Sequence, residues 1–470
     1  MDKVQNQENF IQVDSFYGRK QPSFRFEADV YDCEVIGEIP SSLQGVLYRV
    51  GPDRQYPTLP GDVIVNGDGM VSAFFIRDGH VDFKCRYIKT KRLLAERAAR
   101  RRLYGKYRNP YTDDPAAPAW ERDNTANTSA FYHHGKLFAL REDSIPYEID
   151  TKTLDTLEIA TFGKGMFSHA MTAHPKIDPQ TGEWWSFGLF AQRRFDGDMS
   201  LQVIDHTGKM VREEAFQAPY PGLAHDFAIT QEHVIFPVMP LTVDQERLYR
   251  GGDFYEYTPM LPAVFGIMPR RGTVADLRWF KADGLILGHI MNAYTEGDYV
   301  HLDATVSAGN PFSFFRDPHG QLPTVQEGVA TITRISFDLA SNEEKVMLTA
   351  LPGAVGEMPK IDERFTSQKY RYGFYKTPGG VGRLDWEMRK FEVHSLADAP
   401  AGSQEPIFVP RYEGAAEADG FLLMLVNRLS ENRADLVIID AADMTAPPVA
   451  VVRLPFNQPM AFHGVFVAQA

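Results

Sequence analysis

The sequence of 470 residues has little cysteine, no long apolar run and fewer basic than acidic residues. Cys33 and Cys85 are its only cysteines, and their wide separation argues against a disulfide framework and favours a reducing compartment. No apolar stretch approaches the roughly 18 residues that cross a bilayer. The formal charge of −13 argues against a nucleic-acid partner, because phosphates would repel such a surface. These absences predict a soluble cytoplasmic protein without a transmembrane segment.

Strand patterns separated by tight turns run along the whole sequence. Gly, Asp, Asn and Pro stand at the turns, where a positive or preset φ is required. The pattern predicts seven hairpins: VSAFFI-RDG-HVDFKCRYI, SAFY-HHG-KLFALRE, AMTAHPKI-DPQTGE-WWSFGLF, LQVI-DHTGK-MVREEAF, ILGHIMNAY-TEGD-YVHLDATVS, TITRISFDL-ASNEE-KVMLTAL and FLLMLVNRL-SENRA-DLVIIDA. Many short strands at this spacing predict an all-β sandwich, barrel or propeller. We expect one domain over residues 1–470, with residues 1–23 as an N-terminal arm.

One segment, LLAERAARRRLYG from Leu93 to Gly105, has a helical pattern. Its alanines and arginines favour a helix, and glycine commonly follows a helix end. Because its apolar stripe is thin, a solvated surface helix is favoured over one that touches a membrane.

The thirteen histidines fall into groups by their surroundings. Five stand at predicted hairpin tips and are expected to be solvated: His80, His133, His134, His206 and His319. Three lie on strand patterns near polar residues and are expected to be structural: His233, His301 and His394. Four are embedded in apolar residues of separate predicted strands: His174 in MTAHPKIDP, His225 in GLAHDFAI, His289 in LILGHIMNAY and His463 in MAFHGVFV.

These four histidines are candidate metal ligands, because a buried imidazole is costly unless something bonds it. Neutral imidazole suits iron, copper, zinc and nickel, so the residues alone leave the metal open. The second ring nitrogen of a metal-bound histidine usually donates to a carboxylate. Three glutamates in apolar or Pro-flanked settings could accept those bonds: Glu142, Glu357 and Glu405.

His169 competes with His174 for the same role. The two are five residues apart, so on one strand their side chains would point to opposite faces. Only one of them can face a metal, and the spacing does not decide which.

Several segments together resemble the carotenoid cleavage oxygenase family, over a range from about Phe24 to the C-terminus. They are NGDGMV, FALRED, TAHPKIDPQTGE, AHDFAIT, GHIMNAYTEGD, GEMPKID, EPIFVPR and FHGVF, in that order. The resemblance implies a seven-bladed β-propeller with a loop and helix cap over an axial site that holds one ferrous iron per protein molecule. It implies His174, His225, His289 and His463 as the iron ligands, and therefore His174 in place of His169. It also implies that Glu142, Glu357 and Glu405 orient these histidines.

Within that family, YRNPYTDDP, NTANTS and LREDSIPYEID resemble the branch of lignostilbene dioxygenases and isoeugenol monooxygenases. Members of this branch cleave the alkene beside a 4-hydroxyphenyl ring with O2 and release an aromatic aldehyde such as vanillin. Tyr107 matches the tyrosine that contacts the phenol, whereas Arg141 stands where lysine is usual and Val65 where some members have phenylalanine. Arginine is planar and very hard to deprotonate, so it would pair with a phenolate in a different geometry from lysine.

Further candidate site residues follow from the same motifs. Thr128 matches a threonine that crowds one coordination position in relatives, and Phe312, Phe314 and Phe315 are expected to form a pocket wall. Each has a plainer alternative: Thr128 as a strand-edge hydroxyl, the phenylalanines as core, Tyr107 as a loop cap and Arg141 as the partner of a nearby carboxylate.

The predicted function is therefore that of an iron oxygenase whose partners are a small aromatic alkene and O2. No Rossmann or Walker motif is convincing, so we expect no nicotinamide, flavin or 2-oxoglutarate. Three alternatives stay open: an apocarotenoid-cleaving oxygenase, a non-oxidative or binding propeller, and a copper or zinc protein. The sequence leaves open whether the protein is a monomer or a dimer.

The ligand assignment predicts that His289→Ala abolishes iron binding or activity, because one of four imidazole donors is lost. Metal analysis of the purified variant, together with an activity assay, measures this. Full activity of the variant would rule out the assignment.

Overall fold

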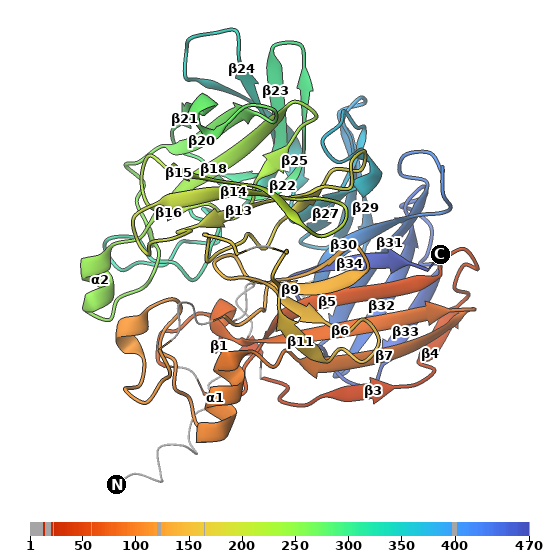
Figure 1. The fold of residues 1–470 in the computed structure, drawn as a ribbon. Coiled ribbons are helices and arrows are strands. Elements are labelled where there is room, and N and C mark those ends of the chain that lie inside the picture. Colours follow the sequence, from red (N-terminus) through yellow and green to blue (C-terminus); the bar gives the residue numbers. More distant parts are fainter. Residues whose placement is uncertain are drawn as a thin grey trace.

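The computed structural model describes residues 13–14, 20–21, 23–57, 59–119, 124–163, 165–396 and 402–469. Strands are far more abundant than helices, and the sheets are arranged around a common centre (Figure 1). Of the arm predicted at residues 1–23, most lies outside the described residues. Two short strands there, β1 (Val13–Asp14) and β2 (Lys20–Gln21), pair with each other.

The sheets divide into seven antiparallel units that follow one another around the ring, which confirms the predicted seven-bladed β-propeller. Blade I contains β34 (His463–Ala468), β5 (Gly45–Asp53), β6 (Asp68–Arg77), β7 (His80–Tyr87) and, at its edge, β3 (Ala28–Val30). Blade II contains β8 (Ser129–His133), β9 (Lys136–Leu140), β10 (Tyr147–Ile149) and β11 (Thr156–Ile159). Blade III contains β12 (Lys176–Ile177), β13 (Trp184–Leu189), β14 (Asp198–Ile204) and β15 (Met210–Gln217).

The remaining four blades follow in sequence order. Blade IV contains β16 (Gly222–Leu223), β17 (Ala228–Ile229), β18 (His233–Thr242), β19 (Glu256–Tyr257), β20 (Ala263–Pro269) and β21 (Arg278–Ala282). Blade V contains β22 (Ile286–Glu296), β23 (Tyr299–Ser307), β24 (Thr331–Asp338) and β25 (Val346–Val355). Blade VI contains β26 (Glu357–Ile361), β27 (Tyr372–Thr377), β28 (Gly380–Asp385) and β29 (Lys390–Ser395). Blade VII contains β30 (Ser403–Pro410), β31 (Gly420–Arg428), β32 (Arg433–Asp440), β33 (Ala450–Leu454) and, at its edge, β4 (Glu34–Gly37).

Segments near both ends of the sequence take part in closing the ring. The last strand, β34, pairs with β5 in blade I, and His463 forms a parallel bridge to Ser129 at the start of blade II. At the outer edge, β4 from the N-terminal part pairs with β33 of blade VII. The innermost strands of neighbouring blades contact one another around the axis: β22 contacts β26, β26 contacts β30, and β30 contacts β34.

The hydrophobic core lies between neighbouring blades, because each sheet is covered on both faces. On β31, Leu423 and Leu425 pack in the cluster shared with blade I, whereas Leu422 and Met424 pack on the opposite face. Successive strand side chains point to opposite faces, so a strand covered on both sides reads as a continuous apolar run. This explains the run FLLMLV. All seven predicted hairpins are present.

The helix predicted over Leu93–Gly105 is present only in part. α1 spans Lys91–Ala99, begins with Thr90 as its N-cap, and ends where Arg100 adopts a left-handed conformation at φ 53°. The prediction placed the helix end at Gly105, but the αL position is filled by an arginine. Beyond this residue, the guanidinium of Arg102 donates to the backbone oxygens of Tyr104 and Gly105. It also pairs with Asp62, so it does not face solvent.

The helices lie outside the blades. α1 and α2 (Gln245–Tyr249) lie to one side of the sheets in Figure 1. The part of the sequence that the structure describes also contains four 3-10 turns: η1 (Ile64–Asn66), η2 (Pro110–Thr112), η3 (Val274–Asp276) and η4 (Glu363–Phe365). Within the described residues, each helix is too short or too polar to cross a membrane.

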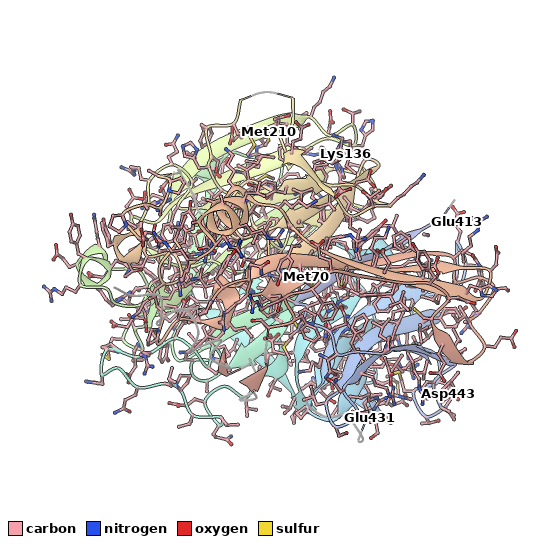
Figure 2. The ribbon with its side chains drawn as sticks, turned by 90° about the horizontal axis from the view of Figure 1, so that it is seen from below. Met70, Lys136, Met210, Glu413, Glu431 and Asp443 are labelled. Carbon is pink, nitrogen blue, oxygen red and sulfur yellow. The ribbon has the colours of Figure 1, made fainter. Side chains whose placement is uncertain are left out.

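Apolar strand residues lie in the interior of the molecule, and charged turn residues lie at its surface. Figure 2 shows Met70 of β6 in the middle of the molecule, whereas Glu431 and Asp443 lie at turns on its edge.

Ring closure predicts a stability effect at Gly464 on β34. A Cβ at this position would lie 2.4 Å from the backbone oxygen of Tyr48, so we expect Gly464→Ala to destabilise the fold by about 1–3 kcal/mol through overpacking. Thermal unfolding followed by calorimetry measures this. Gly165→Ala is the matched control, because a Cβ there meets no atom within 4 Å. Equal unfolding temperatures for the two variants would contradict the expectation.

Candidate metal centre and adjoining pocket

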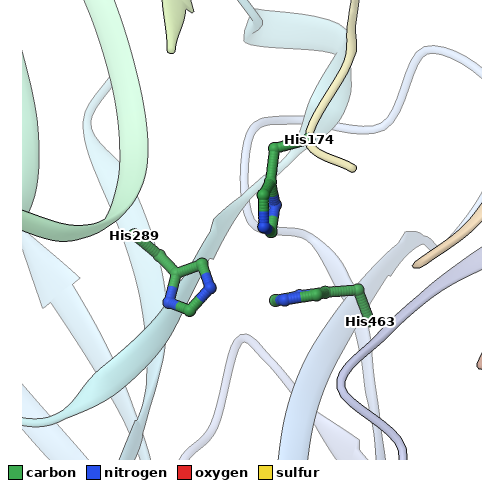
Figure 3. Close-up of side chains that lie close together, drawn as sticks. All are labelled: His174, His289 and His463. Atoms are coloured by element: carbon green, nitrogen blue, oxygen red, sulfur yellow. The ribbon is translucent and has the colours of Figure 1, made fainter. Parts of the chain in front are cut away.

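The four histidines in apolar contexts come together at the innermost strands of four blades. His174 lies two residues before β12, His225 lies between β16 and β17, His289 lies within β22, and His463 begins β34. The ring centroid of His174 lies 4.6, 5.1 and 4.4 Å from those of His225, His289 and His463. Figure 3 shows His174, His289 and His463 with their rings turned toward a common point.

The nitrogen atoms of this cluster are close enough to share one ion. Candidate ligand atoms of the buried residues His174, His289 and His463 all lie within 4.8 Å of one another. His225, which is half-buried, places its Nε2 atom 2.9 Å from Nε2 of His289.

Three glutamates bond the outward ring nitrogens of three of the histidines. Nδ1 of His289 lies 2.6 Å from Glu357, and Nδ1 of His463 lies 2.8 Å from Glu405. His225 makes the same contact with Glu142. An ionised carboxylate only accepts hydrogen bonds, so each Nδ1 facing one carries the proton and each Nε2 carries a lone pair. The lone pairs therefore point into the cluster.

Among the residues that the structure describes, His174 differs from the other three histidines in that no glutamate bonds its ring. Its Nε2 atom is buried and makes no hydrogen bond to any described residue. A buried nitrogen without a partner is costly, on the order of 1–3 kcal/mol. Its backbone N–H donates to Oγ1 of Thr172, at 3.0 Å, which fixes the residue at the start of blade III.

The electrostatics favour the neutral imidazole at His174 and His463, and act in the opposite direction at His289. Burial lowers the pKa of His463 to about 4, and burial together with the other histidines holds the pKa of His174 well below its ordinary value. Burial also acts to lower the pKa of His289, but the carboxylate of Glu357 outweighs it and the pKa is raised. Burial acts to raise the pKa of Glu357, but the imidazole of His289 outweighs it and the pKa falls to about 2.

This arrangement fits a metal ion. Two imidazole nitrogens that bind one ion at right angles, each about 2.1 Å from it, would lie about 3 Å apart. His225 and His289 have that separation. A metal would also satisfy the buried lone pair of His174.

A pocket adjoins the cluster and brings together most of the predicted site residues. Three of the four histidines line it, and so does Glu142. The predicted catalytic and substrate-pocket residues line it as well: Tyr107, Thr128, Arg141, Val65, Phe312, Phe314 and Phe315. Val65 comes from η1, Tyr107 from the segment after α1, and the phenylalanines from the loop after β23, so the predicted cap covers this end of the axis; Thr128 and Arg141 flank β8 and β9 of blade II.

Tyr107 lies between charged and aromatic groups in this pocket. The guanidinium carbons of Arg108 and Arg141 lie 4.7 and 5.6 Å from the centroid of its ring. Arg141 is 2% exposed and also pairs with Asp143 at 3.2 Å. Burial raises the pKa of Tyr107 well above 10, so its hydroxyl stays protonated and can donate a hydrogen bond.

A second cavity reaches the cluster along the axis from the side of β12, β22 and β26. It is lined by His174, His289 and His463, with charged groups such as Lys176, which pairs with Asp226 at 2.8 Å. Neither Glu357 nor Glu405 lines the first pocket. Glu405 lines the second cavity instead.

Some site residues were missed by the sequence analysis. Arg108 and Tyr255 line the first pocket. Arg108 directly follows the predicted Tyr107, but no motif distinguishes Tyr255 within GGDFYEY.

His169 lines neither cavity. The expectation that His133 is solvated was wrong, because this residue is buried against Trp184, with ring centroids 5.7 Å apart.

Comparison with known proteins relates the fold and the site to one family. Residues 22–468 match the family described as retinal pigment epithelial membrane protein. The protein is 41% identical to an isoeugenol monooxygenase of Pseudomonas nitroreducens, over 94% of its own length and 96% of the relative. It is 38% identical to the crystal structure of the lignostilbene dioxygenase of Pseudomonas brassicacearum, with a TM-score of 0.91 over 95% of its own length and 97% of that structure.

A more distant structural relative is a mutant of the Synechocystis apocarotenoid oxygenase, which has 26% identity and a TM-score of 0.83 over 95% of this protein and 97% of that structure. Family match, identity and fold agree with the sequence motifs: the protein belongs to the retinal pigment epithelial membrane protein family, that is, to the carotenoid cleavage oxygenases.

Proposed function

We propose that this protein is an Fe(II)-dependent oxygenase that uses O2 to cleave the alkene double bond of 4-hydroxyphenyl alkenes and releases aromatic aldehydes such as vanillin. Its substrates are of the isoeugenol, 4-vinylguaiacol or lignostilbene type. The observation that carries the proposal is one pocket lined both by imidazoles with inward-facing nitrogens and by Tyr107 with two arginines beside its ring. The identity to isoeugenol monooxygenase supports the choice of substrate over an apocarotenoid.

In this proposal His174, His225, His289 and His463 hold one ferrous ion per protein molecule. The histidines come from blades III, IV, V and I, so the site needs the complete ring, and we propose that residues 1–470 form one domain. Bound iron would supply a redox-active centre for the activation of O2, while the electrons that reduce O2 come from the double bond that is cleaved. Glu142, Glu357 and Glu405 hold the imidazoles in one tautomer and orientation.

The remaining residues act on the substrate. Tyr107 donates a hydrogen bond to the phenol oxygen of the substrate. The positive charges of Arg108 and Arg141 favour ionisation of the substrate phenol. Ionisation of the phenol pushes electron density onto the alkene, which makes it reactive toward an electrophilic oxidant. Phe312, whose ring centroid lies 6.0 Å from that of His225, and Phe314 exclude water around the alkene. Thr128 is half-buried at the same pocket and donates to Oδ1 of Asn127, which fixes the loop that precedes β8.

The role of the glutamates predicts that Glu405→Gln lowers the affinity for Fe(II) by about 10- to 100-fold, because the amide is a weaker acceptor for Nδ1–H of His463. Competition with a chromogenic chelator measures the affinity. Glu343→Gln is the control, because Glu343 is an exposed residue that pairs with the equally exposed Lys345 at the surface. An unchanged affinity in Glu405→Gln would contradict this role.

The proposed reaction is tested by loading the protein with Fe(II) and offering isoeugenol, 4-vinylguaiacol, a 4-hydroxystilbene and an apocarotenal, in air and under argon. We expect an aromatic aldehyde in air alone. Tyr107→Phe removes one hydroxyl, and we expect it to lower kcat/KM by about tenfold, equivalent to one hydrogen bond of about 1.4 kcal/mol. Cleavage of the apocarotenal alone would favour the apocarotenoid oxygenase, and no oxygen-dependent product from any compound would overturn the proposal.

A further inference from the structure

We propose that the hydroxyl of Tyr255 is a second substrate contact at the phenol end of the pocket, and that the pocket selects rings carrying two adjacent oxygen substituents. The inference rests on the proposed function, since it concerns the same pocket. Its substrate class is that of 4-hydroxyphenyl alkenes with a methoxy or hydroxy group beside the phenol.

Tyr255 is held in place by aromatic neighbours. It lies after α2, is 0% exposed, and lines the same pocket as Tyr107 and the histidines. Its ring contacts Phe254 and Phe315 edge-on, with centroids 4.8 and 5.3 Å apart. Edge-on contacts of this kind fix the ring orientation, so the position of the hydroxyl is set before a substrate binds.

The hydroxyl of Tyr255 has an unused proton. Nη1 of Arg108 donates to its oxygen at 3.2 Å. A guanidinium has no acceptor, so this bond leaves the O–H of Tyr255 free to donate. Within the described residues, no acceptor lies at hydrogen-bond distance from that O–H. A buried donor without an acceptor is unfavourable, and the pocket is where a ligand can supply one.

Arg108 brings this hydroxyl to the same end of the pocket as Tyr107. Its guanidinium carbon lies 4.7 Å from the ring centroid of Tyr107 and 5.8 Å from that of Tyr255. Ion pairs with Glu142, at 2.7 Å, and Asp143, at 3.0 Å, fix the guanidinium. Its backbone is held at φ 54°, a left-handed conformation that is uncommon for a bulky side chain and is maintained only by surrounding contacts.

Two hydroxyl donors at one end of a pocket suit two oxygen atoms on one ring. The phenol oxygen accepts from Tyr107, and the neighbouring oxygen accepts from Tyr255. A methoxy oxygen only accepts hydrogen bonds, so it needs a donor such as an O–H. The positive charge of Arg108 at the oxygen of Tyr255 polarises this O–H and strengthens it as a donor.

The protonation state agrees with this role. Burial raises the pKa of Tyr255 far above its ordinary value, which outweighs the opposing charge of Arg108. The hydroxyl therefore remains a donor at neutral pH.

The test is Tyr255→Phe, which removes only the hydroxyl, assayed with isoeugenol and with 4-propenylphenol, which lacks the methoxy group. We expect kcat/KM for isoeugenol to fall about tenfold, and that for 4-propenylphenol to change less than twofold. Tyr249→Phe on α2 is the control, because Tyr249 is 65% exposed, and we expect it to leave both substrates unchanged. Equal losses on both substrates, or no loss on either, would overturn the inference.

A binding measurement separates this inference from the proposed reaction. Guaiacol and phenol carry no alkene, so calorimetric titration with each reports on the ring site without turnover. We expect the wild-type protein to bind guaiacol more tightly than phenol, and Tyr255→Phe to lose that difference while it retains phenol binding. If this holds but no alkene is cleaved, the reaction is wrong and the ring site stands. If alkenes are cleaved but guaiacol and phenol bind equally, or neither binds, the inference on Tyr255 is wrong.

Discussion

The hydrogen bond from an imidazole Nδ1 to a buried carboxylate is the interaction on which the centre of this protein depends. It occurs three times, at His225, His289 and His463, and each time it leaves the Nε2 lone pair facing the axis. Lone pairs that converge without a proton repel one another, so the arrangement is favourable only around a cation. The fold supplies the convergence, because each histidine comes from the innermost strand or loop of a different blade.

The carboxylates in turn have other partners. Glu142 pairs with Arg108 at 2.7 Å, and Glu405 with Lys360 at 3.2 Å. Glu357 accepts from the hydroxyl of Thr305 and from the backbone N–H of Met358, both at 2.6 Å. These bonds keep the three glutamates ionised although they are buried, and buried charges persist only when they are paired or hydrogen-bonded in this way. Arg108 also connects the proposed metal centre to the phenol end of the pocket, since the same guanidinium contacts Glu142, Tyr107 and Tyr255.

The sequence predicted those parts of the fold and site that have a local pattern. Hairpins were recognisable from turn residues, and the four clustered histidines from their apolar surroundings. The blade number followed from the family resemblance alone, because diverged blades carry no repeated motif. The end of α1 was misplaced because Arg100 occupies the left-handed position that usually favours glycine. No hairpin was predicted in blade IV or in blade VI; in blade VI the outer strand β29 is largely exposed and shows no alternation. Tyr255 was missed because only the tertiary structure places it beside Arg108.

We propose that four imidazoles, and no carboxylate, hold one iron on the propeller axis. Crystals of the Fe(II)-loaded protein, measured on both sides of the iron absorption edge, test it most directly. We expect one anomalous peak per protein molecule, within about 2.2 Å of nitrogen atoms of His174, His225, His289 and His463, which is an ordinary imidazole–metal bond length. A peak bonded to Glu142, Glu357 or Glu405, or a peak elsewhere in the molecule, would contradict it.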